Sequence, residues 1–295
     1  MSKSSYPPKG IGIPLNINEP HELVDARNPA SKPAKLQSAI EGNVLVKNIN
    51  NALPLKAPKM LSLFGYNAHV PLVNNHNPFT GGQVGRWYLG LQSMNQSDSQ
   101  LGSIFAAGFG RMPNSASRGH IISGGGSGAA TPSYISTPYE AFSQQAHEDD
   151  TFLLWDFQSL APNVNPASDA CLVFINEFAV EASDRPSLAD SESDTLVRSV
   201  ARKCKNTIVI IHNAGIRLVD AWIDNSNVTA LIFAHLPGQD SGRALVQVVY
   251  GKQSPSGRLP YTVAKRETDY GNLAGPSTSL SSTEVDPQSK FQSNL

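Results

Sequence analysis

Three polar segments of the sequence carry side chains that could do chemistry. The first is residues 176–186, Asn-Glu-Phe-Ala-Val-Glu-Ala-Ser-Asp-Arg-Pro, where four charged groups lie close together: Glu177, Glu181, Asp184 and Arg185. Carboxylates in such a segment are candidates for general acid–base catalysis. The composition also fits a surface loop with a turn at Asp184 and Arg185, so both interpretations stay open on these residues.

The second segment is rich in glycine: residues 124–129 read Gly-Gly-Gly-Ser-Gly-Ala. This spacing matches the G-x-G-x-x-A pattern of a dinucleotide-binding loop, which also requires a helix to begin at the loop. Pro132 disfavours a helical backbone at the residue before it, so that requirement is not met. Ala129 departs from the G-x-S-x-G pattern of a nucleophile elbow. We expect a tight turn that lets the backbone approach another backbone or a ligand.

The third segment, residues 235–242, follows an apolar run and precedes a helical one. Asp240 and Ser241 are well placed to cap that helix, so we expect a structural role for them. His212 and His235 each end a predicted strand without carboxylates at a fixed spacing. We therefore expect them to be packed or hydrogen-bonded histidines rather than metal ligands.

The two cysteines, Cys171 and Cys204, are too few for a disulfide framework and match no zinc-binding spacing. Each precedes a predicted strand. The sequence leaves open whether they form a disulfide or stay as two buried thiols. These patterns predict no metal site and no cofactor.

Charge and hydrophobicity argue against two classes of partner. The chain has 23 Lys and Arg residues against 24 Asp and Glu residues, a net charge of −1, so it lacks the basic surface typical of nucleic-acid binding. The longest apolar run, near residues 207–212, is far shorter than the ~20 residues of a membrane-spanning helix. The first residues lack the apolar stretch of a secretory signal, so no signal peptide is predicted.

The apolar runs predict the elements that position these segments. Six runs have the length and composition of strands: residues 60–65, 119–123, 151–157, 172–176, 207–212 and 228–234. Helical spacing of apolar residues marks five further stretches: residues 36–45, 139–148, 191–203, 217–225 and 240–251. Strands that are apolar on both faces and alternate with amphipathic helices predict a mostly parallel sheet with helices on both faces. We therefore expect an α/β fold, a three-layer sandwich of about six strands, since a barrel needs eight.

The same pattern divides the chain into three parts. Residues 1–35, rich in Pro, Asn and Lys, are expected to form an irregular lead-in. Residues 36–265 form the α/β domain, with a long loop excursion at 66–118 that is dense in Asn, Gly, Ser and Pro. A turn at 254–261 is expected to lead into a last strand, and the polar residues 266–295 predict a disordered tail.

Several motifs occur in an order that resembles one known family. They are Glu-Gly-Asn-Val-Leu-Val-Lys-Asn at 41–48, Leu-Pro-Leu at 53–55, the glycines at 124–128, Phe-Ile-Asn at 174–176 with Glu181 and Asp184-Arg185, Leu-Pro-Gly-Gln at 236–239, and Pro-Ser-Gly-Arg-Leu-Pro-Tyr-Thr at 255–262. Over about residues 27–273 the chain resembles the C-terminal α/β sandwich domain of glycoside hydrolase family 3, in its fungal β-glucosidase-like branch.

The resemblance implies a retaining β-glucosidase, which hydrolyses terminal β-D-glucosyl residues in the breakdown of cellulose and β-glucan. By its place in the motif, Glu181 is the candidate catalytic acid/base, on a loop over the mouth of a catalytic barrel. Residues around it are candidates for substrate binding: Gly125, Gly126, Ser127, Glu177, Asp184 and Arg185. Family members carry the nucleophilic Asp in an N-terminal barrel of ~250 residues, whereas 40 residues precede Glu41 here. We therefore expect the acid/base domain without the nucleophile barrel, inactive alone.

The acid role requires a raised pKa at Glu181, which partial burial or a neighbouring carboxylate such as Glu177 would supply. Residues 182–183 are Ala-Ser, where family members often carry Gly and an aromatic residue, so a platform for sugar stacking is missing. The alternative functions are a non-catalytic carbohydrate-binding or interaction module and, on the glycine-rich loop only, a nucleotide-binding protein.

The resemblance also implies the partners and the location. The partners are a β-glucoside or oligosaccharide substrate, a catalytic barrel domain of the family, or a second copy bound through an exposed barrel-facing surface. No nucleic acid or membrane is expected. The location implied is extracellular, and two N-x-S/T sequons, at Asn95 and Asn227, are compatible with it.

Overall fold

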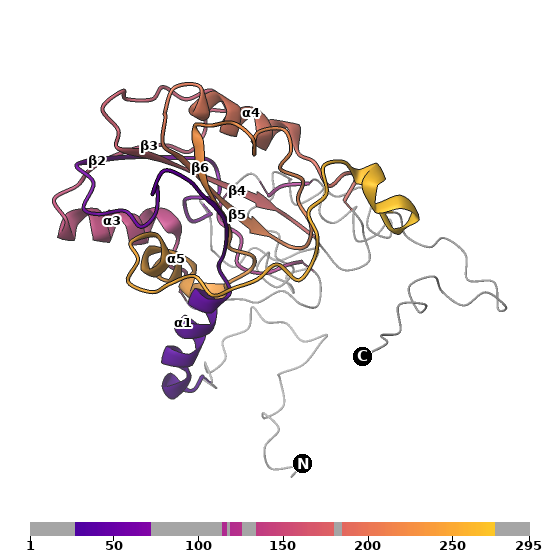
Figure 1. Cartoon of the computed structure of the whole chain (residues 1–295). Helices are drawn as coiled ribbons and strands as arrows, with labels where there is room; N and C mark the ends of the chain where they lie inside the picture. Colours follow the sequence, from indigo (N-terminus) through magenta and orange to yellow (C-terminus); the bar gives the residue numbers. More distant parts are fainter. Residues whose placement is uncertain (1–26, 72–113, 117–118, 126–133, 180–184, 275–295) are drawn as a thin grey trace, which may run out of the picture.

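The computed structural model describes residues 27–71, 114–116, 119–125, 134–179 and 185–274 (Figure 1). Its centre is a six-stranded sheet with the strand order β1-β6-β5-β4-β2-β3. The strands are β1 (Val44–Asn48), β2 (Met60–Phe64), β3 (Phe152–Asp156), β4 (Ala170–Glu177), β5 (Thr207–Asn213) and β6 (Val228–Phe233). All neighbouring strands are parallel except β1, which pairs antiparallel with β6 at one edge.

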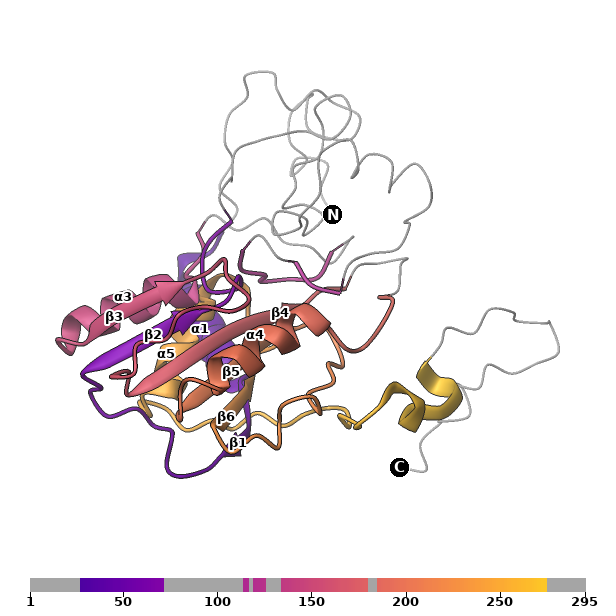
Figure 2. The ribbon, with the colours of Figure 1, turned by 90° about the horizontal axis from the view of Figure 1, so that it is seen from above.

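Helices cover both faces of the sheet (Figures 1 and 2). Three of them lie on one face: α1 (Lys32–Glu41), α3 (Pro138–Glu148) and α5 (Ser241–Val249). Helix α4 (Ser191–Ala201) lies on the other. This is the three-layer α/β sandwich that the sequence predicts.

The alternation of side chains along β4 shows how the sheet separates two cores. Leu172 and Phe174 pack with residues of α3 and α5, whereas Val173 and Ile175 pack with residues of α4. Every residue of β4, β5 and β6 is buried. Their sequences are therefore continuous apolar runs, because strands covered on both faces gain from apolar side chains at every position.

The first helix and the first strand differ from the prediction. Helix α1 begins at Lys32, inside the predicted lead-in, and ends at Glu41, and residues after it form strand β1 instead of continuing the helix. Val44 lies four positions after Ile40, so the apolar spacing runs across the boundary. The helix ends because the side chain of Asn43 donates a hydrogen bond to the carbonyl of Ala39, which satisfies an acceptor of the last turn.

Three other predicted elements are not formed. Residues 119–123 lack strand structure although Ile121 and Ile122 are buried, and residues 217–225 form turns rather than a helix. The segment after the turn at 254–261 adds no strand to the sheet. In the first two cases, hydrogen bonds to distant residues replace those of a strand or helix. The amide of Ile121 donates to the side chain of Asn67, and the amide of Leu218 donates to the carbonyl of Leu188.

The beginning of the predicted disordered tail is ordered. Residues Glu267–Ala274 form a 3-10 helix, η6. The hydroxyl of Tyr270 holds this helix to the preceding chain, because it donates to the carbonyl of Thr262 and accepts from the amide of Ala264, both at 2.8 Å. The polar composition is explained by the position of η6 at the surface. Residues 275–295 lie outside the described residues.

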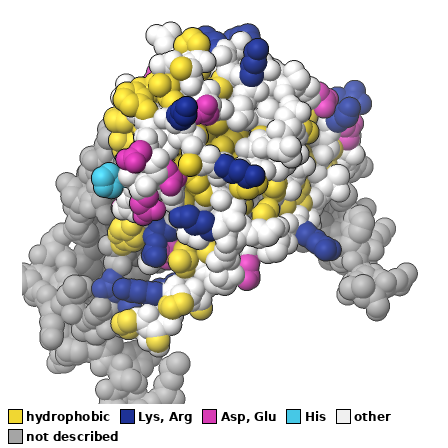
Figure 3. Space-filling model, turned by 60° about the vertical axis from the view of Figure 1, so that its left-hand side comes forward, with side chains coloured by type: hydrophobic (Ala, Val, Ile, Leu, Met, Phe, Trp, Pro, Cys, Tyr) yellow, Lys and Arg dark blue, Asp and Glu magenta, His cyan; other side chains and the backbone are white. Residues whose placement is uncertain are grey.

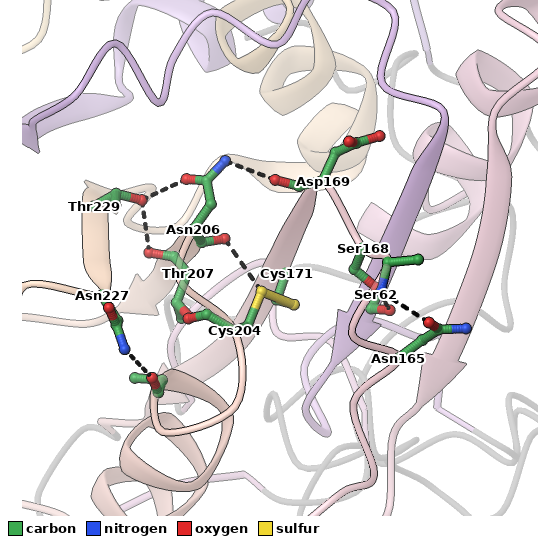
Figure 4. Close-up of a disulfide and its surroundings, with 12 residues drawn as sticks. Ser62, Asn165, Ser168, Asp169, Cys171, Cys204, Asn206, Thr207, Asn227 and Thr229 are labelled. Atoms are coloured by element: carbon green, nitrogen blue, oxygen red, sulfur yellow. Dashed lines mark hydrogen bonds between the residues drawn. A yellow bond between two sulfur atoms is a disulfide. The ribbon is translucent and has the colours of Figure 1, made fainter.

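The cysteines form a disulfide, which settles the question that the sequence leaves open (Figure 4). Cys171 is in β4, and Cys204 lies between α4 and β5. Beside the disulfide, the side chain of Asn206 donates to the carbonyl of Asp169 and accepts from the hydroxyl of Thr229. The amino ends of β4, β5 and β6 are thus joined by one covalent bond and by neutral hydrogen bonds.

Figure 3 shows the side of the molecule that carries α3, the edge strand β3 and its neighbour β2. Hydrophobic side chains lie among charged ones on this side. On the edge strand β3, Phe152 is 60% exposed and Trp155 is 54% exposed. Exposed apolar side chains of this size on an edge strand are typical of a surface that another polypeptide covers. Within the described residues, the helices are too short and too polar to cross a membrane.

Candidate functional site

The polar segments found in the sequence meet at one edge of the sheet. Strands β2, β4, β5 and β6 are parallel, so their carboxyl ends lie together, and ligands of open α/β sheets bind at this edge. The amide of Gly125 donates to the carbonyl of Ala179 just after β4, at 2.9 Å. The amide of Gly238, in the segment after β6, donates to the carbonyl of Ile122 at 3.1 Å. The three segments therefore form one continuous rim.

Close approach explains why glycine occupies the rim. A Cβ atom added at Gly124 would lie 3.3 Å from the carbonyl oxygen of Ala179. The expectation of a tight turn in which one backbone approaches another therefore fits the described part of the glycine-rich segment. Three further candidates nearby lie outside the described residues: Gly126, Ser127 and Asp184.

Glu181, the predicted acid/base, also lies outside the described residues. The residues on either side of its segment are described, and both belong to the carboxyl edge of the sheet: Ala179 just after β4, and Arg185. The segment that carries Glu181 thus begins and ends at the rim that contains Gly125.

Glu177 and Arg185 belong to a buried network of charges. Glu177 is fully buried, and its carboxylate pairs with Arg185 at 2.7 Å and with Arg217 at 3.0 Å. Arg217 is also fully buried and pairs with Asp194 of α4 at 2.8 Å. Asp194 in turn accepts a hydrogen bond from the indole nitrogen of Trp222. Two arginines and two carboxylates therefore alternate beneath the rim.

Burial dominates the electrostatics of Glu177. Loss of hydration raises the pKa of Glu177, while the charges of Arg185 and Arg217 lower it. The charge on Glu177 therefore depends on both arginines. Direct contact of Glu177 or Arg185 with a sugar stays a prediction. In the structure the Glu177 carboxylate and the Arg185 guanidinium pair with each other inside the buried network.

Arg217 and Asp194 are site-supporting residues that the sequence analysis missed. Both fall within predicted helices, where a charged residue is normally assigned to the solvent-facing side. The signal that was available is that Arg217 precedes a mostly apolar stretch, Leu-Val-Asp-Ala-Trp-Ile, a few residues after the end of a buried strand.

A second, uncharged network lies beside the first. The side-chain amide of Asn176 donates to the side-chain oxygen of Asn67 at 3.0 Å. Asn67 donates to Nδ1 of His212 at 2.8 Å, and Nε2 of His212 lies 2.9 Å from the hydroxyl of Ser241. Because Nδ1 accepts from an amide, His212 is neutral and donates from Nε2. His212 is thus a hydrogen-bonded histidine, as the sequence predicts.

Burial lowers the pKa of both histidines in this region. The pKa of His212 lies well below its usual value because the ring is fully buried, and the neighbouring His120 lowers it further. Burial lowers the pKa of His120 to about 4. The two rings pack edge to face with their centres 4.4 Å apart. A proton on either ring would have little hydration to stabilise it.

The uncharged network fixes the chain around the rim. Asn176 accepts a hydrogen bond from the amide of Ala116 at 2.9 Å, and Nδ1 of His120 donates to the carbonyl of Asn67 at 3.0 Å. The amide of Phe178 donates to the carbonyl of Asn114. Residues 114–116 and His120 are thereby held against the chain at the ends of β2 and β4.

A cavity of about 470 Å³ opens at the carboxyl end of β6, between α1 and residues 234–240. His235 is one of the residues that line it. Among the described residues, no group of three or more His, Cys, Asp or Glu side chains is arranged to hold a metal ion.

Comparisons with known proteins identify the family of the chain. A model of the glycosyl hydrolase family 3 C-terminal domain matches residues 43–293. The chain therefore belongs to glycoside hydrolase family 3, and the part of the family that it matches is the C-terminal domain.

Two curated relatives from fungi show how much of a longer protein the chain matches. The chain is 49% identical over 294 residues to a probable β-glucosidase M from Aspergillus fumigatus, a match that covers 99% of this chain and 34% of the relative. It is 49% identical over 269 residues to β-glucosidase cel3A from Pyricularia oryzae, covering 91% of this chain and 34% of the relative. The chain thus spans about a third of the length of the curated relatives it matches.

Solved structures give the same fold. The β-glucosidase D2-BGL from Chaetomella raphigera superimposes with a TM-score of 0.65 at 29% identity, over 83% of this chain and 31% of that one. A β-D-glucoside glucohydrolase from Trichoderma reesei superimposes with a TM-score of 0.63 at 29% identity, over 89% of this chain and 33% of that one. These neighbours share the α/β sandwich with the mostly parallel sheet.

Proposed function

We propose that this chain supplies the acid/base part of a retaining β-glucosidase active site, with Glu181 as the acid/base. The observation that carries the proposal is the position of the described residues on either side of Glu181. These residues, Ala179 and Arg185, lie at the carboxyl edge of the sheet, and a backbone hydrogen bond joins Ala179 to Gly125 in the glycine-rich loop. Membership of the family and the β-glucosidase names of the relatives support the same function.

The reaction assigns two proton transfers to Glu181. In the first step it gives its proton to the glycosidic oxygen while a nucleophilic Asp attacks the anomeric carbon and the leaving group departs. In the second step ionised Glu181 takes a proton from the water that displaces the Asp. Retention requires the two carboxyl groups to lie ~5–5.5 Å apart on opposite faces of the sugar. The nucleophile comes from a barrel domain, so the chain on its own is inactive.

The barrel domain and an extracellular location complete the proposal. The exposed side chains of Phe152 and Trp155 provide an apolar surface that a further domain or a second copy covers. The disulfide between Cys171 and Cys204 supports a secreted protein, because such bonds persist in oxidising compartments. The substrate class proposed is terminal β-D-glucosides from cellulose or β-glucan.

The test supplies a barrel domain in trans. The purified chain is assayed on an aryl β-glucoside alone and with the N-terminal part of the Aspergillus fumigatus relative that lies outside the match. We expect the chain alone to be no faster than its Glu181→Gln variant. With the added domain, turnover should appear and fall ~10²–10⁴-fold in Glu181→Gln.

A matched control is Asp156→Asn, which should leave restored turnover unchanged, because Asp156 binds the amides of Gln158 and Ser159. Strong hydrolysis by the chain alone would show that a second carboxylate of this domain acts as nucleophile, with Asp184 the first to test. Sugar binding without turnover in the mixture would instead identify a non-catalytic carbohydrate-binding module.

A further inference from the structure

A basic pocket lies beside the rim, where the amino end of α1 meets the segment after β6. Its volume is about 440 Å³, within the range of small-ligand sites. Four cationic side chains line it: Arg27 just before α1, Lys32 and Lys35 in α1, and Arg243 in α5. Asp240 is the one acidic residue among its described lining residues. The basic pocket therefore has an excess of positive charge, in a chain whose net charge is −1.

The two lysines of α1 are placed against the electrostatic preferences of a helix. Lys32 is the first residue of α1 and Lys35 follows three positions later, so two like charges are neighbours on the helix surface. The positive end of the helix dipole lies in this turn, which contains no acidic residue. Neither lysine forms an ion pair with a described residue. Both repulsions destabilise the start of α1, and an anion in the basic pocket would relieve them.

Arg243 adds a cation from a distant part of the sequence. Its Nη1 donates to the carboxylate of Asp240 at 3.1 Å, and its side chain is 53% exposed. Asp240 is buried and orients Arg243 at the start of α5. A guanidinium has five N–H donors, so the bond to Asp240 leaves others for the oxygens of a carboxylate or a phosphate.

The uncharged part of the lining is suited to a hydroxylated ligand. Gln144 and Gln239 line the basic pocket, and a side-chain amide can both donate to and accept from a hydroxyl group. Tyr134 is 45% exposed in the same lining, and its hydroxyl donates to Glu140 at 3.2 Å. An aromatic ring provides an apolar surface next to these polar groups. Amides and an aromatic ring together match the polar edge and the apolar face of a sugar ring.

We propose that the basic pocket binds an anionic sugar, a sugar ring that carries a carboxylate or a phosphate group. Lys32, Lys35 and Arg243 bind the anionic group, and the amides of Gln144 and Gln239 bind the hydroxyl groups. Ionised acceptors form the stronger hydrogen bonds, so the charge supplies most of the affinity and the amides supply the preference for a sugar. This inference goes beyond the function proposed above and does not depend on the role of Glu181.

The test measures binding to the purified chain by isothermal titration calorimetry in low salt. The ligands are glucuronate, glucose 6-phosphate, glucose and inorganic phosphate. We expect one of the two charged sugars to bind about tenfold more tightly than glucose and than inorganic phosphate, because it alone uses both the cations and the amides. The affinity should fall as salt is added, since exposed charges are screened. The tighter of the two charged sugars identifies the anionic group. No binding of either one, or equal binding of glucose or of inorganic phosphate, would overturn the inference.

Two double variants locate the binding. Lys32→Gln with Lys35→Gln should weaken binding of the charged sugar about tenfold, since two cations of the site are lost. The matched control is Lys56→Gln with Lys59→Gln, which removes the same charge from exposed residues before β2, at the amino end of the sheet. The control should leave the affinity unchanged. Equal affinities in both double variants would overturn the inference.

Urea unfolding without ligand separates binding from folding. The variant with Lys32→Gln and Lys35→Gln should be at least as stable as the unchanged chain, because it removes the repulsion at the start of α1. A lower stability would show that the two lysines support the fold, and the inference would fail.

Discussion

The two ends of the sheet are stabilised by different chemistry. At the amino end, Cys171 and Cys204 form a disulfide, and the hydrogen bonds around them join neutral groups such as Asn206 and Thr229. At the carboxyl end, fully buried Glu177 and Arg217 hold opposite charges 3.0 Å apart inside the same fold. The disulfide therefore lies at one end of the sheet, and the buried ion pairs lie at the other, beside the uncharged network of Asn67, Asn176 and His212.

This difference supports the proposal that the carboxyl end of the sheet serves function. A buried ion pair stabilises a fold no better than well-packed apolar side chains do, because both charges must lose their hydration. Stability alone thus does not explain the network of Glu177, Arg185, Arg217 and Asp194. Its position does: it lies under the rim at the carboxyl edge, where α/β sheets bind ligands.

The largest effect is expected from breaking the charged end. Replacing Arg217 with Met leaves Glu177 and Asp194 buried without their shared cation. The free energy of unfolding should fall by ~3–5 kcal/mol, measured by urea unfolding at pH 7. The control is Arg266→Met, since Arg266 forms an exposed pair with Asp269 whose loss should cost less than ~1 kcal/mol. A loss below ~1 kcal/mol for Arg217→Met would mean that the network carries no net ionic stabilisation.

The covalent end should respond to removal of the disulfide. The bond joins residues 33 positions apart, and releasing a loop of that length should lower the free energy of unfolding by ~3–4 kcal/mol. The double variant Cys171→Ala with Cys204→Ala measures this in urea. At the same time, hydrogen exchange at the Phe178 amide, just after β4, should stay as in the unchanged chain under native conditions. Increased exchange there would show that the two ends of the sheet are coupled and not stabilised independently.

Much of the fold could be predicted from the sequence, because long apolar runs have few alternatives. Strands β4, β5 and β6 each contain a run rich in Val, Ile, Leu and Phe, and their burial on both faces required the helices that the sequence also indicates. The errors fall where local pattern and tertiary contact disagree. Ile121 and Ile122 have strand composition, but the Asn67 side chain binds the backbone there instead of a neighbouring strand.

The candidate site was predictable in its location and not in its support. The motif around Glu181 and the glycines before it indicate a shared rim, and the Gly125–Ala179 hydrogen bond joins their described parts. Arg217 could not be found in the same way. It acts across a long separation in the sequence, on Glu177 and on Asp194, and a single sequence contains no periodicity that reports such pairs.

The smallest effect expected here concerns acid and also acts at the carboxyl end. His120 has a pKa of about 4 in the fold, below the ordinary 6.5, because it is buried. The folded state then binds fewer protons than the unfolded state between these values. The contribution of neutral His120 to the free energy of unfolding is therefore fully present above pH 6.5. It is lost as the pH falls toward 4, and the loss is about 3 kcal/mol for this shift. The pKa of His212 is also lowered by burial, so His212 adds to the decline.

Urea unfolding from pH 7 to 4 measures the effect. The decline should shrink in His120→Asn and persist in His147→Gln, a change on the exposed surface of α3. Equal slopes in all three proteins would show that carboxylates, and not the buried histidines, set the acid sensitivity of this end of the sheet.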